Sequence, residues 1–164
     1  MELTESNLIT ALEQDFRGTL GQIVEQSKLE PISDSFIHNN GAICREGGDL
    51  AKLEHELVDG LYLRRMILNK GTVIISAIHK RDHVWFLLSG SITVVSKNGT
   101  EKFSAPWVNY SESGSQRVIY ADENSVFQNI FKNPKKLTYL DDLEEYNYCN
   151  TEEEYLEYIN KKEI

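Results

Sequence analysis

The sequence is poor in the residues that mark specialised protein classes. Its 164 residues include only two cysteines, three prolines and two methionines. Cys44 and Cys149 lie far apart and form no CxxC motif, so we expect free thiols in a reducing compartment rather than a disulfide framework. No apolar run approaches the roughly 18 residues that a membrane span needs, and the N-terminal segment is too polar and acidic for a secretory signal. These absences predict a cytoplasmic protein without a membrane partner.

Catalytic motifs that can be recognised in a single sequence are absent too. The chain has no glycine-rich phosphate loop, no GxSxG and no HExxH. Ser113-Gly114-Ser115 lacks the strand–turn–helix setting of a nucleophile elbow. No reaction class therefore stands out from the residues alone.

Charge is spread unevenly along the chain, whose formal net charge is −9. Residues 1–50 carry a net charge of −6, residues 51–136 carry +4, and residues 137–164 carry −7. The two acidic arms would repel nucleic acid, so nucleic-acid binding is not expected. The arms either form solvated helical surfaces, fold over the basic middle, or meet a basic partner.

The hydrophobic pattern predicts helices at both ends. Residues 7–28 follow the spacing of an amphipathic helix, which Gly18 and Gly21 could divide into two pieces. Residues 33–48 read as a loop, and Asp49 could cap a short helix that ends near Val58. After Pro134, Asp141 or Asp142 could cap one short helix, and Thr151 to Glu154 forms a capping box for another.

Between these arms the period changes to that of strands. Eight short apolar runs alternate with turn signals at steady spacing, which is typical of a β-sandwich or barrel. The runs are 61–68, 72–79, 84–88, 91–96, 101–103, 107–111, 116–121 and 125–131. The sequence thus predicts one mainly β domain: a helical extension over 1–59, a barrel over 60–133 and an acidic helical tail over 134–164.

The segment from Gly71 to Gly90 resembles the first signature of the cupins, which are double-stranded β-helices of jelly-roll type. In register with that signature, His79 matches its second histidine, Ala77 replaces the first, and His83 replaces the glutamate. In the second signature Gly114 is retained, and Arg117 occupies the histidine position. The resemblance implies a cupin-type jelly-roll barrel.

Residues 54–131 resemble, more closely, a group of cupin-like proteins encoded by tailed bacteriophages. The matching pieces are His55, 59–64, 70–72, 78–80, His83, 105–106, 114–117, 120–121 and 123–126. This resemblance implies a location in the host cytoplasm or in the virion, and it carries no established reaction. Because cupins commonly pair through their barrel edges, a homodimer or a higher homo-oligomer is expected.

The same positions suggest two kinds of ligand. A cupin site typically holds iron, manganese, nickel or zinc with imidazoles and a carboxylate, so His79 and His83 are candidate metal ligands, with His55 as a third. Arg117 opposes a cation but suits an anion, because a guanidinium makes paired hydrogen bonds to carboxylate or phosphate. The alternative role of Arg117 is a salt bridge to Glu112 or Glu123 at the barrel rim.

Together, Arg64, His79, His83 and Arg117 would form a positive pocket for a small anion, with Tyr120 among the aromatic walls. Three functions stay open. The first is a phage-type cupin-like protein that binds a small anionic molecule, with or without a divalent metal. The second is a virion or host-interaction protein that uses the jelly roll as a scaffold and the acidic helices as its contact. The third is a metal-dependent isomerase, lyase or oxygenase. We rank them in that order, so catalysis is the least favoured.

Overall fold

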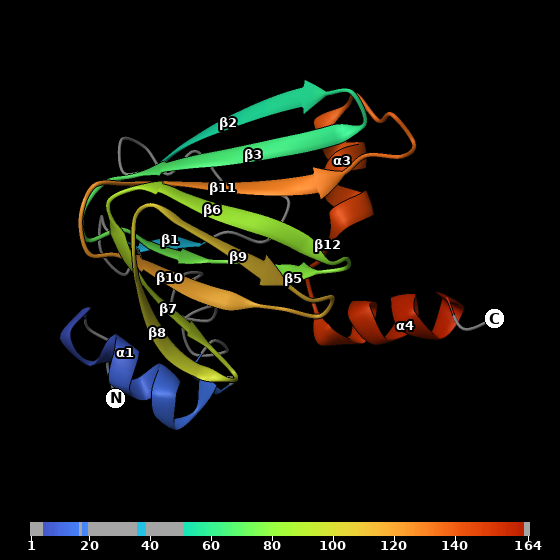
Figure 1. The fold of residues 1–164 in the computed structure, drawn as a ribbon. Coiled ribbons are helices and arrows are strands. Elements are labelled where there is room, and N and C mark those ends of the chain that lie inside the picture. The colour runs from blue at the N-terminus through green and yellow to red at the C-terminus, as the bar shows by residue number, and fades with distance from the viewer. Residues whose placement is uncertain (1–4, 17, 20–35, 39–50, 163–164) are drawn as a thin grey trace.

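The computed structural model describes residues 5–16, 18–19, 36–38 and 51–162, and the chain is mainly β, with helices at both ends (Figure 1). The helices are α1 (Glu5–Gln14), α3 (Leu140–Asn147) and α4 (Glu152–Lys162). The strands are β1 (Phe36–His38), β2 (Ala51–Val58), β3 (Leu61–Leu68), β4 (Val73–Ile75), β5 (Ile78–His79), β6 (His83–Ser89), β7 (Ser91–Ser96), β8 (Gly99–Ser104), β9 (Trp107–Ser111), β10 (Arg117–Ala121), β11 (Ser125–Lys132) and β12 (Tyr148–Cys149).

Two five-stranded sheets enclose the core. The first sheet has the order β1-β4-β10-β7-β8, and the second has the order β2-β3-β11-β6-β9. All of their strand pairs are antiparallel except β1 with β4. A small third sheet pairs β12 of the acidic tail with β5. The mainly β fold with terminal helices that the sequence predicted is confirmed.

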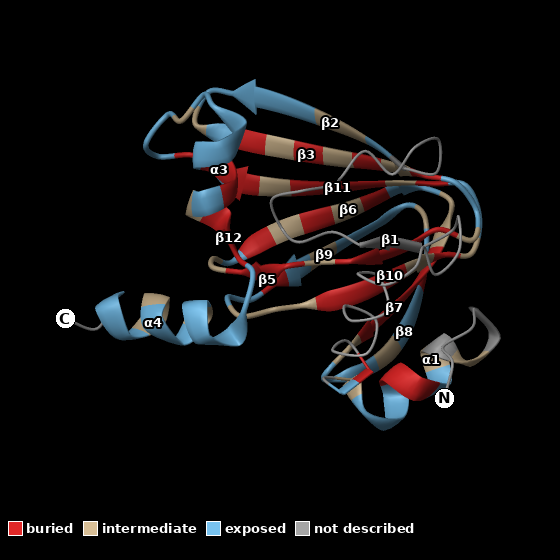
Figure 2. Cartoon of the chain, turned by 180° about the vertical axis from the view of Figure 1, so that it is seen from behind, coloured by how far each residue is buried: buried red, intermediate tan, exposed pale blue. Residues whose placement is uncertain are grey.

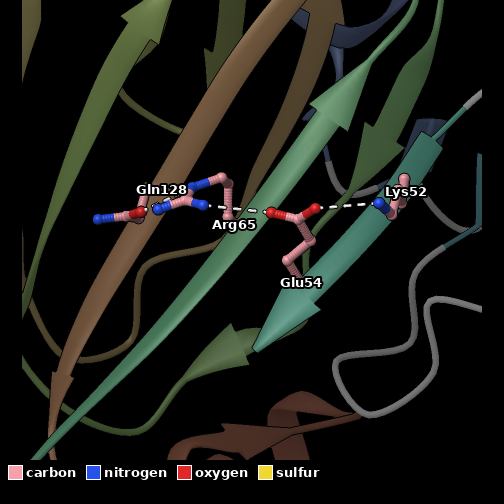
Figure 3. Close-up of polar contacts among 4 residues, drawn as sticks. All are labelled: Lys52, Glu54, Arg65 and Gln128. Atoms are coloured by element: carbon pink, nitrogen blue, oxygen red, sulfur yellow. Dashed lines mark hydrogen bonds and ion pairs between the residues drawn. The ribbon is translucent and has the colours of Figure 1, made fainter. Parts of the chain in front are cut away.

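Strict alternation decides which side chains enter the space between the sheets. On β3, Tyr62, Arg64, Met66 and Leu68 are buried, whereas the residues between them face outward. Arg65 therefore lies on the outer face. There it donates hydrogen bonds to Glu54 Oε2 at 3.2 Å and to Gln128 Oε1 at 3.0 Å (Figure 3). One step along the strand thus separates a surface arginine from an interior one.

The interior has an apolar half and a polar half. The apolar half is a cluster of aliphatic and aromatic side chains from both sheets, comprising Met66, Leu68, Ile74, Trp85, Leu87, Ile92, Val94, Phe103, Ile119, Ala121 and Phe127. Figure 2 shows the buried residues in red, alternating with residues of intermediate exposure in tan along β3 and β6. Apolar burial is the dominant favourable term in folding. The apolar half therefore contributes more to the stability of the fold than the polar half does.

Helical segments cover two parts of the barrel. Ala11 and Leu12 of α1 pack on the outer face of the first sheet against Val73, Ile75 and Val118. At the other end of the barrel, Leu143 of α3 and Tyr148 of β12 pack with Tyr62, Ala77 and Phe131. None of the described helices has the length and apolar character that crossing a membrane requires. The acidic tail is therefore part of the folded body through α3 and β12, whereas α4 extends away from it with no buried residue (Figure 2).

The start of α4 has the predicted capping box in a modified form. The Thr151 hydroxyl accepts a hydrogen bond from Glu154 N at 3.2 Å, and the Glu154 carboxylate accepts one from Asn150 N at 2.8 Å. The reciprocal bond thus reaches the residue before the cap rather than the cap itself. The predicted C-terminal helices are confirmed, but α3 begins at Leu140 after Tyr139, so Asp141 and Asp142 lie in its first turn rather than at its cap.

Two local predictions are wrong. The helix expected over 49–58 is strand β2 from residue 51, because pairing along all of β3 satisfies its backbone and overrides the helical spacing of its leucines. The loop expected over 33–48 contains β1, which pairs in parallel with β4. The remainder of that loop, including Cys44, lies outside the described residues, as does the part of the helix expected over 7–28 that follows residue 19.

Two glycines provide a matched test of how tightly the sheet ends pack. Gly60 and Gly90 have nearly the same left-handed φ, +81° and +82°, but a Cβ at Gly60 would meet nothing within 4 Å. A Cβ at Gly90 would lie 2.4 Å from the Asn124 carbonyl oxygen. We expect Gly60→Ala to lower the free energy of unfolding by about 1 kcal/mol and Gly90→Ala by about 3 kcal/mol. Urea denaturation measures both, and equal losses would contradict the packing described here.

Candidate functional site

Five polar side chains meet inside the barrel at the end that the acidic tail covers. This polar cluster consists of Arg64, His79, His83, Arg117 and Asn129, from β3, β5, β6, β10 and β11 respectively. Each of the five exposes 6% or less of its surface. Every second residue of the strands faces inward at this end as well, but here those inward-facing residues are polar.

The two histidines form a stacked pair. Their ring centroids lie 4.2 Å apart, and Phe131 contacts both rings. Nδ1 of His79 lies 3.1 Å from the Ser115 carbonyl, and Nδ1 of His83 lies 3.2 Å from the Arg81 carbonyl. Because a carbonyl oxygen only accepts, each Nδ1 carries the proton and each Nε2 keeps a lone pair.

Burial keeps this pair uncharged. It lowers the pKa of His83 to about 3, and the charge of Arg117 acts in the same direction. The pKa of His79 is held well below its usual value, first by burial and then by the neighbouring His83 and Arg117. Both imidazoles are therefore neutral at physiological pH and serve as hydrogen-bonding groups rather than cations.

Arg117 is the central cation of the cluster. Its Nη2 donates to Nε2 of His83 at 2.9 Å and lies 3.5 Å from Oδ1 of Asn129, while its Nη1 donates to the Ser111 hydroxyl. Burial lowers its pKa to about 10, so the guanidinium remains protonated at neutral pH. Within the described residues, no carboxylate lies within 4 Å of Arg117, and its Nε has no hydrogen-bond partner. The alternative salt bridge expected at the rim is not formed with Glu112 or Glu123.

Arg64 lies closer to the covered end of the barrel. Its guanidinium carbon is 5.2 Å from the ring centroid of Tyr148, which contacts His79 edge-on at 5.0 Å. Glu144 of α3 is buried nearby; burial raises its pKa to about 7, and Arg64 opposes that rise. The tail thus brings an aromatic ring and a carboxyl group towards this arginine.

His55 and Tyr120 do not line the polar cluster. Nδ1 of His55 lies 2.7 Å from the Tyr62 hydroxyl, and two rings, Tyr62 and Phe131, connect it to the stacked pair. Tyr120 packs with the cluster beneath α1, on the opposite face of β10 from Arg117. Tyr120 was predicted to line the same pocket as Arg117, but residues an odd number of positions apart on a strand face opposite sides.

The three histidines therefore do not fit one metal site. Among the described residues, no group of three His, Cys, Asp or Glu side chains could hold a metal ion. The lone pair of His83 Nε2 accepts from Arg117 instead, and a metal ligand needs that lone pair free. This chemistry suits neutral and anionic ligands better than iron, manganese, nickel or zinc.

Three residues at the site were not among the candidates. Ser111 and Asn129 follow the inward alternation of β9 and β11, so strand phase could have identified them. Tyr148 could not be found in that way, because it comes from the tail and enters the barrel through its pairing with His79.

Tyr148 and the polar cluster leave little room inside the barrel. A cavity of about 10 Å³ lies between Arg64, His79, Arg117, Asn129 and Tyr148, among other residues. That is room for about one water molecule. A larger space, about 310 Å³, lies between the edge strands β8 and β9; we call it the edge groove. Its lining includes Arg117, Ser111, Trp85 and Phe103, so it connects the surface with the cluster.

No protein-family model and no curated protein matches the sequence. Among solved structures, the chain is similar to a cupin superfamily protein from Desulfitobacterium hafniense DCB-2, with 9% identity, a TM-score of 0.47, and coverage of 51% of this chain and 78% of that one. It is also similar to a cupin 2 domain-containing protein from Halorhodospira halophila, with 17% identity, a TM-score of 0.46, and coverage of 51% and 65%. An acetylacetone dioxygenase from Acinetobacter johnsonii gives 18% identity, a TM-score of 0.43, and coverage of 50% and 59%.

Proposed function

We propose that the protein binds a small anion, a carboxylate or a phosphate, at Arg117. The observation that carries this proposal is a protonated guanidinium, 6% exposed, whose hydrogen-bond partners are all neutral. Burying a charge is costly unless an opposite charge accompanies it. An anion at this position would supply the missing charge.

The hydrogen-bonding pattern of Arg117 supports this choice of ligand. Ser111, His83 and Asn129 hold its two terminal nitrogens, so the side chain is fixed in place. The third nitrogen, Nε, has no hydrogen-bond partner among the described residues. A charge-assisted bond from a fixed donor is about twice as strong as a neutral one, and a fixed donor loses little entropy on binding.

The edge groove supplies the space that the interior lacks. A volume of about 310 Å³ falls at the lower end of the range for small-molecule sites. Arg117, Trp85 and Ser111 line the inner part of the groove. Its outer part is polar and is lined by Lys97, Asn98 and Glu101. The anionic end of the ligand would lie at the inner end of the groove, with its body towards the rim.

The histidine pair has a supporting role in this proposal. His83 accepts from Arg117 through Nε2 and is itself oriented through Nδ1 by the Arg81 carbonyl. The pair therefore positions the guanidinium and adds no charge of its own. A binding protein needs nothing more from these residues, whereas a cupin-type enzyme would need them as metal ligands.

Replacing Arg117 by methionine tests the proposal. We expect acetate or inorganic phosphate, titrated into the full chain by calorimetry, to bind the unaltered protein and to bind R117M about 10- to 100-fold more weakly, because a charged hydrogen bond and its counter-ion are lost. Arg65→Met is the matched control, since Arg65 lies on the outer face of the same barrel.

The stability of R117M makes the result interpretable. Methionine fills much of the same volume without a charge to desolvate, so R117M is expected to remain folded, with a melting temperature no lower than that of R65M. Equal anion affinity in R117M and R65M, or no anion binding to the unaltered protein, would refute the proposed function.

A further inference from the structure

The acidic tail forms a groove of its own, separate from the edge groove. This tail groove lies between α3, β12 and α4 and has a volume of about 670 Å³. Its charged lining consists of five carboxyl groups and two ammonium groups: Asp141, Glu144, Glu145, Glu154, Glu157, Lys80 and Lys161. Leu140, Tyr148 and Tyr158 add apolar and aromatic surface. The groove is thus of ligand size and has an excess of negative charge.

Glu144 distinguishes this groove from an ordinary acidic surface. Its side chain exposes only 6% of its surface, although it lines the groove. Within the described part of the chain, nothing donates a hydrogen bond to its carboxylate and no cationic group lies within 4 Å of it. A buried carboxylate usually has a partner because an unpaired one is costly. Burial also raises its pKa to about 7, although the charge of Arg64, which lies on the barrel side of Glu144, opposes that rise.

The two lysines of the groove do not provide that counter-ion. The Lys80 ammonium donates to the backbone carbonyl of Glu145 and lies 5.5 Å from the ring centroid of Tyr158. Among the described residues, neither Lys80 nor Lys161 lies within 4 Å of a carboxylate. The position opposite Glu144 therefore remains available to a cation from outside the chain.

We infer that the tail groove binds an alkylammonium ion, with Glu144 as its counter-ion. A single buried carboxylate matches one ammonium group. A metal ion would need more ligands, and no group of three suitable side chains is present among the described residues. The Tyr148 and Tyr158 rings favour an organic cation, which can lie against aromatic faces, and Leu140 can contact its alkyl stem. Glu154 and Glu157 of α4 would attract the cation to the groove.

Two sources supply this chemistry: a lysine side chain on a partner protein and a free polyamine. Both present an ammonium group on a flexible alkyl stem, so Glu144 would bind either in the same way. The inference does not depend on anion binding at Arg117, because the two grooves have no lining residue in common.

The diamine cadaverine, titrated into the full chain by calorimetry at 150 mM salt, tests the site itself. We expect Glu144→Gln to weaken its binding at least tenfold, because glutamine keeps the shape and removes the charge. Glu157→Gln should weaken binding about two- to threefold, since that residue lies on the exposed wall. Glu153→Gln is the matched control on α4, because it is exposed and does not line the groove.

Further ligands identify the source. Tighter binding of spermidine than of a lysine-containing peptide would point to a polyamine, and the reverse to a partner protein. Thermal unfolding should show that E144Q is folded. If it is not folded, the effect of Glu157→Gln on cadaverine affinity still tests the site. If cadaverine does not bind, or if E144Q and E153Q weaken binding equally, the inference is overturned.

Discussion

Replacing Phe131 by alanine is expected to lower the free energy of unfolding by about 3–5 kcal/mol, the usual cost of emptying a buried aromatic site. Phe131 exposes 2% of its surface, and its ring contacts Tyr62, His79, His83 and Tyr148. The alanine variant would remove the apolar wall between the histidine pair and the tail. Urea denaturation followed by circular dichroism measures the loss.

Leu156→Ala is the control for this substitution. Leu156 lies on α4 and exposes 48% of its surface, so its loss should change stability by no more than about 0.5 kcal/mol. A similarly small effect for F131A would mean that the tail does not pack on Phe131 as described. In that case the acidic tail would not cover this end of the barrel.

Acidification from pH 8 to pH 5 is expected to destabilise the protein by about 2 kcal/mol through His83 alone. The folded pKa of His83 is about 3, below the value of 6.5 for an exposed histidine. Between these two values the unfolded chain binds the proton and the folded chain does not. The contribution is therefore complete above pH 6.5 and is lost progressively as the pH falls towards 3. His79, whose pKa is lowered in the same direction, adds to the effect.

Glu144 works in the opposite direction and must be separated from this effect. Its folded pKa of about 7 lies above the value of 4.5 for an exposed glutamate, so its protonation favours the folded state as the pH falls. The informative quantity is the difference between the unaltered protein and His83→Asn, because Glu144 is common to both. Urea midpoints at several pH values should show a shallower acid loss in H83N. Parallel profiles would contradict a buried, neutral His83.

The strands and the position of the polar cluster could largely be predicted from the sequence. Alternation and turn residues located the strands from residue 61 to 131, with a break between Val73–Ile75 and Ile78–His79. The motif register placed His79, His83 and Arg117 at inward positions, and the structure brings them together with Arg64. These successes share a physical origin, since strand phase alone determines which side chains face the interior.

Other features depend on contacts between distant segments. The spacing of Leu53 and Leu57 suits a helix as well as a strand, and only the pairing of β2 with β3 decides between them. Local sequence did not determine whether the Tyr120 and His55 side chains face the polar cluster, and neither of them does. The insertion of Tyr148 beside His79 joins residues 69 positions apart, and no local pattern announces it.

The pairing of β12 with β5 has a kinetic consequence. Lys80 N donates to the Asn147 carbonyl at 2.8 Å beside the Tyr148–His79 pair, so opening this end of the barrel would require backbone separation. Such local unfolding takes microseconds or longer, whereas exposed side chains reorient in picoseconds to nanoseconds. The edge groove between β8 and β9 has no lining residue from β5 or β12. A molecule bound in that groove would therefore leave without this backbone separation.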